Sequence, residues 1–200
     1  MLKIQVLNSP HPFAANCYLL SAGKQWAIVD PTAPYNSALV DGEVRYVLLT
    51  HAHFDHILEV ESWVESGAQV IILSEEAAAL SDPMRNCFKL YNGSDNGYFG
   101  PVRAVNNGDV LDFGDLTIKV MATPGHTSGC ATYLIDNVAF VGDTVFEGGG
   151  FGRYDLPTGN FVMLRDSIRK ICSLPEDILL YPGHGGTTSV KEYKQDLIIR

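Results

Sequence analysis

The sequence predicts an α+β fold in which two mixed β-sheets pack together and helices cover them on the outside. Short strand-like segments come in runs, each run is followed by a helical segment, and this order occurs twice. Apolar residues make up 46% of the 200 residues and charged residues 18%, which is the balance of a chain with a packed core. No linker rich in Pro, Gly or Ser divides the chain, so we expect residues 1–200 to form a single domain.

Five strands are expected in the first half, because short apolar or alternating runs rich in β-formers are separated there by turn-forming residues. These runs are 2–7, 17–21, 26–29, 44–49 and 69–73. The run at 44–49 is almost continuously apolar, which is typical of a strand buried on both faces. Apolar residues at helical spacing predict a helix over 57–66 that ends at Gly67, and Ser-Glu-Glu before 77–80 predicts a short capped helix.

The second half repeats this order after an irregular region over 84–107. Within that region, residues 91–101 mix turn formers with aromatic residues and predict either a surface loop or a mobile flap beside a site. The pair Asp136-Asn137 predicts a hairpin turn, and 161–172 is an amphipathic helix. The strands expected here are 110–113, 116–122, 131–135, 138–141 and 178–181.

Charge and composition exclude several classes of function. With 14 Lys and Arg against 23 Asp and Glu, the net charge of −9 argues against a broad surface for nucleic acid or anionic membranes. No apolar run is long enough to span a bilayer, and the first residues resemble a strand rather than a signal peptide. We therefore expect a cytoplasmic protein. The four cysteines are scattered without a CxxC pair, which argues against a disulfide scaffold or a thiolate zinc site.

A cluster of histidines follows the buried strand, in the sequence Thr50-His51-Ala52-His53-Phe54-Asp55-His56. In extended backbone the side chains of His51, His53 and Asp55 project from one face and can converge on one point. His56 would turn the opposite way and could serve a second metal alongside Asp55. Imidazole and carboxylate ligands together favour zinc, iron or manganese over calcium or magnesium.

Three further candidate ligands stand at predicted strand ends. His126 and His184 each lie in a Pro-Gly-His turn, and Asp143 follows the strand at 138–141. Two such turns are hard to explain by packing, so we interpret both histidines as ligands. His11 lies in Pro-His-Pro-Phe and is expected to be a loop residue rather than a ligand.

In their order and spacing, these motifs resemble the metallo-β-lactamase fold superfamily, with HxHxDH followed by a histidine, an aspartate and a final histidine. The resemblance implies a four-layer αββα sandwich with a metal site at one edge of the two sheets. It also implies two divalent cations per chain, zinc being the first expectation and iron or manganese the alternatives. The first ion would be held by His51, His53 and His126, the second by Asp55, His56 and His184, and Asp143 would bridge both.

Asp30, in Val-Asp-Pro, occupies the position of the aspartate that supports the ligands in this superfamily. Thr32 stands where a glycine commonly follows Asp-Pro, so a structural cap is the alternative role for Asp30.

Two cations about 3.5–4 Å apart can lower the pKa of a bridging water toward 7 and polarise a substrate carbonyl. Asp55 could accept or orient the proton of the attacking water. The expected function is therefore metal-assisted hydrolysis of a small-molecule substrate.

The motifs Gly-Asp-Thr-Val-Phe at 142–146, Gly-Arg-Tyr-Asp at 152–155 and Pro-Gly-His-Gly-Gly-Thr-Thr at 182–188 look like the glyoxalase II branch and its short bacterial relatives. That resemblance implies thioester hydrolysis with hydroxyacylglutathione as the reference substrate. Arg153 could bind an anionic substrate, or it could fix its loop by pairing with Asp155. Glyoxalase II has a C-terminal helical domain that helps to bind glutathione, and we expect no counterpart here. Recognition would then come from 91–101 together with Arg85, Lys89 or Arg103.

Other activities of the same fold remain alternatives. A persulfide dioxygenase would keep one iron, bound by two histidines and an aspartate with open positions for oxygen. The sequence Gly-His-Thr-Ser-Gly-Cys at 125–130 is compatible with that pattern, although the Gly-Gly-Thr-Thr after His184 is not typical of it. Hydrolysis of another ester or a lactone is the other alternative.

Overall fold

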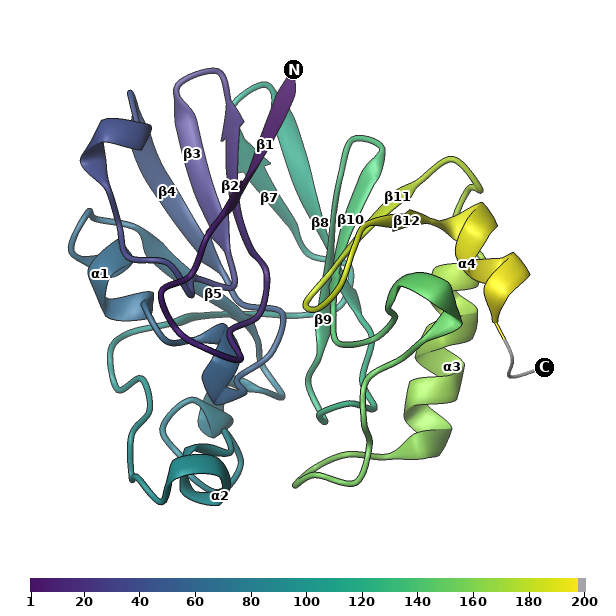
Figure 1. The fold of residues 1–200 in the computed structure, drawn as a ribbon. Coiled ribbons are helices and arrows are strands. Elements are labelled where there is room, and N and C mark those ends of the chain that lie inside the picture. The colour runs from purple at the N-terminus through teal and green to yellow at the C-terminus, as the bar shows by residue number, and fades with distance from the viewer. Residues whose placement is uncertain (198–200) are drawn as a thin grey trace.

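The computed structural model describes residues 1–197, in which two six-stranded β-sheets pack against each other (Figure 1). The first sheet has the order β1-β2-β3-β4-β5-β6 and the second the order β12-β11-β10-β9-β8-β7. Both are mixed, because the first sheet is antiparallel from β1 to β3 and parallel from β3 to β6, while β10 and β11 form the parallel pair of the second. The predicted fold class is confirmed.

The strands of the first sheet are β1 (Leu2–Leu7), β2 (Cys17–Ala22), β3 (Gln25–Val29), β4 (Glu43–Leu48), β5 (Gln69–Leu73) and β6 (Arg103–Val105). Those of the second sheet are β7 (Val110–Phe113), β8 (Leu116–Ala122), β9 (Ala131–Ile135), β10 (Val138–Gly142), β11 (Leu179–Pro182) and β12 (Thr188–Ser189). The α-helices are α1 (Val60–Val64), α2 (Phe88–Asn92), α3 (Phe161–Cys172) and α4 (Val190–Asp196), and short 3-10 turns occur at Ser37–Leu39, Phe54–His56, Ala77–Ala79 and Glu147–Gly149.

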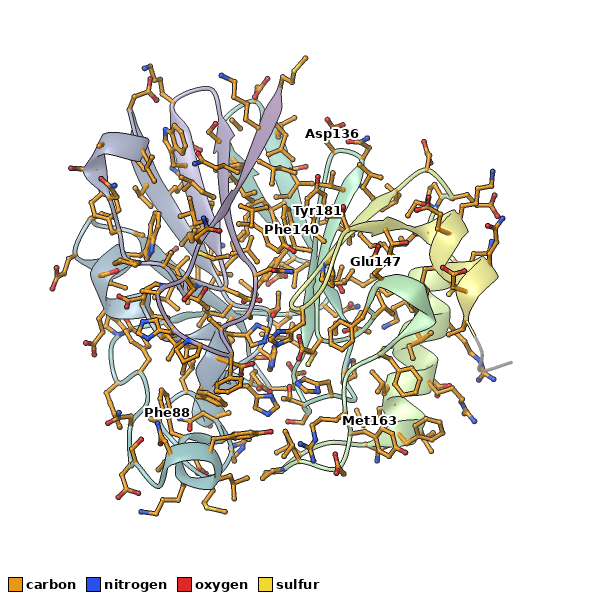
Figure 2. All side chains as sticks on the ribbon, in the orientation of Figure 1. Phe88, Asp136, Phe140, Glu147, Met163 and Tyr181 are labelled. Atoms are coloured by element: carbon orange, nitrogen blue, oxygen red, sulfur yellow. The ribbon has the colours of Figure 1, made fainter. Side chains whose placement is uncertain are left out.

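Apolar side chains form three layers of core. The central layer lies between the sheets and includes Phe140 and Tyr181 (Figure 2). A second layer packs the outer face of the first sheet against α1 and α2, and a third packs β10 and β11 against α3 and α4. Residues of β4 alternate between layers, with Val47 in the outer one and Leu48 in the central one. The prediction that this strand is buried on both faces is therefore confirmed.

The ten predicted strands are confirmed to within one residue at each end, and α3 has the predicted bounds. The helix expected over 57–66 is shorter, because residues 54–56 form a 3-10 turn and α1 begins only at Val60. The prediction of a capped helix at 77–80 is wrong, because Ala77–Ala79 form a 3-10 turn. The Glu76 side chain is buried and accepts a hydrogen bond from the Ala52 backbone N–H, so it does not cap this turn.

Two α-helices and two strands were not expected from the sequence, namely α2, α4, β6 and β12. The three-residue strand β6 lies in the irregular region 84–107 and pairs in parallel with β5. The start of α4 did carry a signal, since Ser189 and Glu192 form a capping box. Within residues 1–197, none of the helices combines the length and the apolar character that crossing a bilayer requires.

Candidate metal centre

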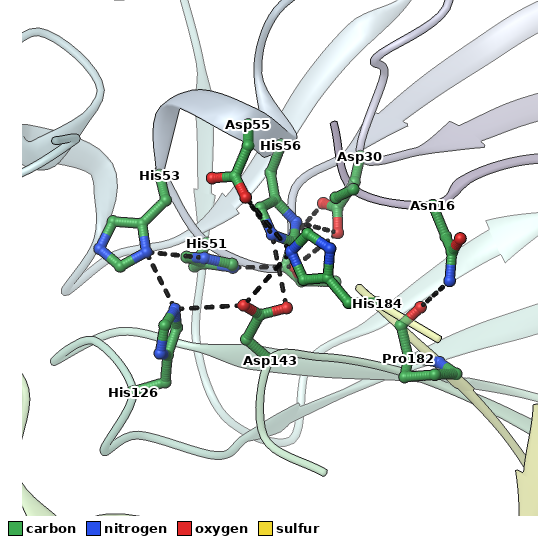
Figure 3. Close-up of polar contacts among 12 residues, drawn as sticks. Asn16, Asp30, His51, His53, Asp55, His56, His126, Asp143, Pro182 and His184 are labelled. Atoms are coloured by element: carbon green, nitrogen blue, oxygen red, sulfur yellow. Dashed lines mark hydrogen bonds and ion pairs between the residues drawn. The ribbon is translucent and has the colours of Figure 1, made fainter. Parts of the chain in front are cut away.

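The candidate ligands lie on connections that follow four strands, at one edge of the two packed sheets. β4 leads to the histidine cluster, β8 to His126, β10 to Asp143 and β11 to His184. Figure 3 shows their side chains turned toward one another from both sheets. Residues that are more than 130 positions apart in the chain thus meet at one place.

The first group consists of three buried imidazoles, those of His51, His53 and His126. His53 Nδ1 lies 3.1 Å from His51 Nε2 and 2.9 Å from His126 Nε2. In a tetrahedral site with metal–nitrogen distances of about 2.0–2.1 Å, ligand nitrogens are roughly 3.3 Å apart. The three nitrogens therefore have nearly the spacing that one small divalent cation requires.

The second group consists of Asp55, His56 and His184. Asp55 Oδ2 lies 3.2 Å from His184 Nε2 and 3.9 Å from His56 Nε2. The expectation that Asp55 shares an extended face with His51 and His53 is wrong, because Phe54–His56 form a 3-10 turn. That turn carries the Asp55 carboxylate to His184, on the far side of the cluster from His53 (Figure 3).

Asp143 lies between the two groups. Its Oδ2 is 3.5 Å from His126 Nε2 in the first group and 3.7 Å from His184 Nε2 in the second, and its Oδ1 is 3.4 Å from His56 Nε2. One carboxylate thus faces nitrogens of both groups, as a bridging ligand would.

Hydrogen bonds to the opposite ring nitrogens fix three of the imidazoles. His56 Nδ1 bonds Asp30 Oδ2 at 2.8 Å, His51 Nδ1 bonds Thr50 Oγ1 at 3.2 Å, and His126 Nδ1 bonds the Arg153 carbonyl oxygen at 2.6 Å. For His56 and His126, the carboxylate or carbonyl acceptor requires the proton on Nδ1, which in the neutral ring leaves the lone pair on Nε2, the atom that faces the centre.

Asp30 is held in place by the start of the histidine cluster. Its Oδ1 accepts a hydrogen bond from the Thr50 backbone N–H at 2.8 Å, and its Oδ2 accepts one from Thr50 Oγ1 at 2.7 Å. Its backbone φ of +48° is in the left-handed region, which Asp tolerates better than most residues. The sequence left two roles open for Asp30, support of the ligands or a structural cap. The structure shows that Asp30 contacts the candidate ligand His56.

The cluster favours neutral imidazoles in its first group and ionised carboxylates. Burial lowers the pKa of His53 to about 3 and also lowers the pKa of His51 and His126. Burial alone would raise the pKa of Asp143, but His56, His126 and His184 outweigh it and hold that pKa well below its usual range. Burial opposes a charge on His56, yet Asp30, Asp143 and Asp55 raise its pKa. A cation would replace the His56 proton.

The residues fit a cation because two buried atoms face each other without a hydrogen-bond partner. His56 Nε2 and Asp143 Oδ1 have no partner among the described residues, although they are fully shielded from solvent. Buried polar atoms are nearly always paired, so such orphans need an explanation. A cation bound by both the nitrogen and the oxygen would give each atom a partner.

Two glycines allow the ligands to approach. A Cβ atom at Gly183 would collide with Asp143 Oδ1 and with the His56 ring, and one at Gly152 would collide with the Asp143 carbonyl oxygen. The first of the two explains why the histidine at 184 is preceded by glycine. Asn16 fixes the same turn, since its Nδ2 donates to the carbonyl oxygen of Pro182 (Figure 3) and to that of Gly185.

A cleft of about 850 Å³ opens over the cluster and is lined in part by His53, Asp55, His126, Asp143 and His184. Arg153 also lines it, with Nε 2.8 Å from Asp155 Oδ1 and Nη2 2.9 Å from Asp155 Oδ2. This is the loop-fixing pair that the sequence offered as one of two roles for Arg153. His11 lies elsewhere, with Nε2 in a 2.8 Å hydrogen bond to Glu59 Oε1.

Three residues that hold the cluster in place were missed at the sequence level. Glu76 binds the backbone N–H of Ala52, between two ligands, Thr50 links His51 to Asp30, and Asn16 binds the turn before and after His184. Glu76 follows β5 and Asn16 precedes β2, so neither is near the ligands in the sequence. For Thr50, its place directly before His51 was the available signal.

A family model described as the metallo-beta-lactamase superfamily matches residues 11–184 of the chain. Among curated relatives, a protein of Bacillus subtilis named probable metallo-hydrolase YqgX is 32% identical over 188 residues, covering 90% of this chain and 89% of the relative. The hydroxyacylglutathione hydrolase GloC of Haemophilus influenzae is 29% identical over 194 residues, covering 92% and 91%.

Three solved structures are similar to this chain over nearly its whole length. The BLEG-1 B3 metallo-beta-lactamase aligns with a TM-score of 0.87 and 31% identity, covering 99% of this chain and 98% of the other. TTHA1623, solved in a di-iron-bound form, aligns with a TM-score of 0.83 and 27% identity, covering 96% and 98%. ETHE1 from Myxococcus xanthus aligns with a TM-score of 0.75 and 27% identity, covering 98% and 83%.

Proposed function

The chain belongs to the metallo-β-lactamase superfamily, and on that premise we propose that it is a metal-dependent hydrolase that cleaves a thioester of the hydroxyacylglutathione type. The observation that carries this proposal is the double cluster at the base of the cleft, with two complete groups of ligand atoms and Asp143 between them. A site for a single ion would not need the second group.

We propose that His51, His53 and His126 hold one divalent cation, that Asp55, His56 and His184 hold a second, and that Asp143 contacts both. Zinc is the first candidate, with iron or manganese as alternatives, because the ligands are imidazoles and carboxylates. When bound, such a pair supplies a hydroxide nucleophile at neutral pH and polarises the carbonyl that it attacks.

The protein's own groups would orient the reactants. Asp55 is the least buried carboxylate of the cluster and lines the cleft, so it is placed to accept or orient the proton of the attacking water. Its pKa is lowered, because His56 and His184 outweigh the effect of burial, so the group is ionised and can accept a hydrogen bond that orients the water. Asp30 keeps His56 oriented through the bond to Nδ1.

The thioester assignment is supported by the similarity to the Haemophilus hydrolase and by the motifs around Asp143 and His184. We propose that the substrate is a small anionic molecule and that its charged end would contact Arg153 in the cleft wall.

The four cysteines are all free thiols, which suits a reducing compartment, so we propose that the protein is cytoplasmic. We also propose that residues 1–200 act as one domain.

A persulfide dioxygenase with a single iron is the second candidate. It is supported by one observation, the structural similarity to ETHE1 from Myxococcus xanthus. The complete second group of Asp55, His56 and His184 favours the hydrolase.

The proposed function is tested by hydrolysis assays with S-lactoylglutathione, an acyl-CoA, an ester, a lactone and a β-lactam, before and after treatment with a chelator. We expect thioester cleavage that the chelator abolishes. His184→Ala should lower kcat more than about 100-fold, because it removes a ligand rather than a support of one. His11→Ala is the matched control, because His11 lies outside the cluster. Chelator-resistant activity, or equal loss in both variants, would contradict the proposal.

A further inference from the structure

The wall of the cleft beside the cluster is built from apolar and aromatic side chains, those of Phe13, Phe54, Tyr91, Phe146 and Leu156. They come from connections and helices on both sides of the cleft, including α2 at the lower left of Figure 1 and the chain that leads to α3 at the lower right. The apolar wall is therefore a property of the assembled fold and not of one loop.

These side chains reach the candidate ligands themselves. Phe54 stands between His53 and Asp55 in the chain, and its ring packs against that of Tyr91 with centroids 4.9 Å apart. The ring of Phe146 lies 6.1 Å from that of His184, at the other end of the cluster. A substrate carbonyl at the cluster would thus have apolar surface directly beside it.

Charged groups that could bind a polar substrate portion are scarce at this wall. Arg153 is the one Lys or Arg among the described residues that line the cleft. Its Nε and Nη2 are bound to Asp155, and its Nη1 donates to the Tyr91 hydroxyl at 3.2 Å. Lys89, expected as a glutathione contact, pairs with Asp95 at 2.8 Å outside the cleft.

We propose that this apolar wall binds the acyl group of the substrate and that the enzyme selects thioesters whose acyl group is bulky and apolar, an aromatic 2-hydroxyacyl group being preferred over lactoyl. The inference rests on the proposed function and adds the substrate class to it. A cleft of about 850 Å³ has room for a bulky acyl group beside the cluster, and lactoyl would leave the aromatic side chains in contact with water. The polar glutathione portion would lie toward the open mouth.

The matched substrates are S-mandeloylglutathione and S-lactoylglutathione, which share the thiol and the 2-hydroxyl group and differ by phenyl against methyl. Each kcat/KM is divided by the rate of hydroxide-catalysed hydrolysis of the same thioester, because phenyl also changes the reactivity of the carbonyl. Burial of one methylene is worth roughly fourfold, or about 0.8 kcal/mol. We therefore expect the corrected ratio to favour mandeloyl by more than about tenfold.

Tyr91 is the residue of choice for substitution, because its side chain is about half exposed and it is not a candidate ligand. Tyr91→Ala removes both the ring and the hydroxyl and should reduce the ratio at least threefold, whereas Tyr91→Phe loses only the bond to Arg153 and should keep it. Phe99→Ala is the control, since this aromatic side chain is 69% exposed and does not line the cleft.

The outcomes separate the two proposals. If the metal-loaded protein cleaves neither thioester, the proposed function fails and this inference fails with it. If both are cleaved but lactoyl is preferred or equal, or if Tyr91→Ala leaves the ratio unchanged, the substrate class is wrong while the hydrolase stands. A mandeloyl preference that falls in Tyr91→Ala and persists in Tyr91→Phe and Phe99→Ala supports the inference.

Discussion

Replacing Asp30 by Asn tests whether the second group of ligands depends on a carboxylate behind it. The substitution keeps the shape of the side chain and suits the left-handed backbone at this position, since Asn tolerates positive φ. It removes the negative charge that contacts His56 Nδ1 at 2.8 Å and accepts a hydrogen bond from Thr50 Oγ1. We expect the affinity for the second cation to fall most, because His56 belongs to that group and contacts Asp30 directly.

The size of the effect follows from these contacts. Loss of a carboxylate that supports a ligand histidine typically costs 10–100-fold in metal affinity, which is about 1.4–2.7 kcal/mol. Asp30 is linked to the first group through Thr50, whose hydroxyl is 3.2 Å from His51 Nδ1. A neutral hydrogen bond contributes about 1 kcal/mol, or roughly fivefold. The two affinities should therefore fall by clearly different factors.

The assay is a titration of the metal-free protein with Zn²⁺ in competition with a chromophoric chelator, for the unmodified protein and for Asp30→Asn. Thr50→Val is the matched variant, because it breaks the link to His51 and leaves the contact between Asp30 and His56. Thermal unfolding of the metal-free proteins shows whether any loss reflects the fold. Two affinities unchanged in Asp30→Asn, or a larger loss for the first ion than for the second, would refute the reasoning.

Two further predictions concern the fold around the cluster. Glu76→Ala leaves the buried Ala52 N–H without its acceptor and should destabilise the metal-free protein by about 1–3 kcal/mol in urea unfolding. Glu76→Gln keeps an acceptor and should cost less than about 1 kcal/mol. Equal losses of stability in the two variants would contradict this role of Glu76. The metal-free protein should lose stability as the pH falls from about 6.5 toward 3, because His51, His53 and His126 have lowered pKa values and the unfolded chain binds their protons first. The slope is about 1.4 kcal/mol per pH unit for each titrating histidine, and Glu76 opposes it, because burial raises the pKa of that carboxyl. A stability that is flat or rises from pH 6.5 to 5 would contradict the prediction.

The strands were predictable because each is a short run with a simple burial pattern. Leu116–Ala122 alternates and Val138–Gly142 is buried throughout, and both patterns are visible in the sequence. β6 and α2 were not predictable, since three residues are too short for a period and the five residues of α2 start after a left-handed Cys87. Their positions depend on contacts made by the folded chain.

The candidate ligands were identified by residue type and order, but their grouping needed the backbone. An extended chain would have placed Asp55 with His51, and only the 3-10 turn at Phe54–His56 carries it toward His184. Glu76 shows the opposite limit. A glutamate after a strand is usually a surface residue, and nothing local indicates that it will be buried against Ala52, which is distant in the sequence.

The most direct test of the central claim is the number of metal ions that thioester hydrolysis requires. Purified protein is stripped with a chelator and reloaded stepwise with Zn²⁺, Fe²⁺ or Mn²⁺, while bound metal and cleavage of S-lactoylglutathione and S-mandeloylglutathione are measured in the same samples. The double cluster predicts that activity returns only as the second equivalent binds. One iron per chain, with oxygen consumed on a persulfide and no thioester cleaved at any loading, would contradict the account.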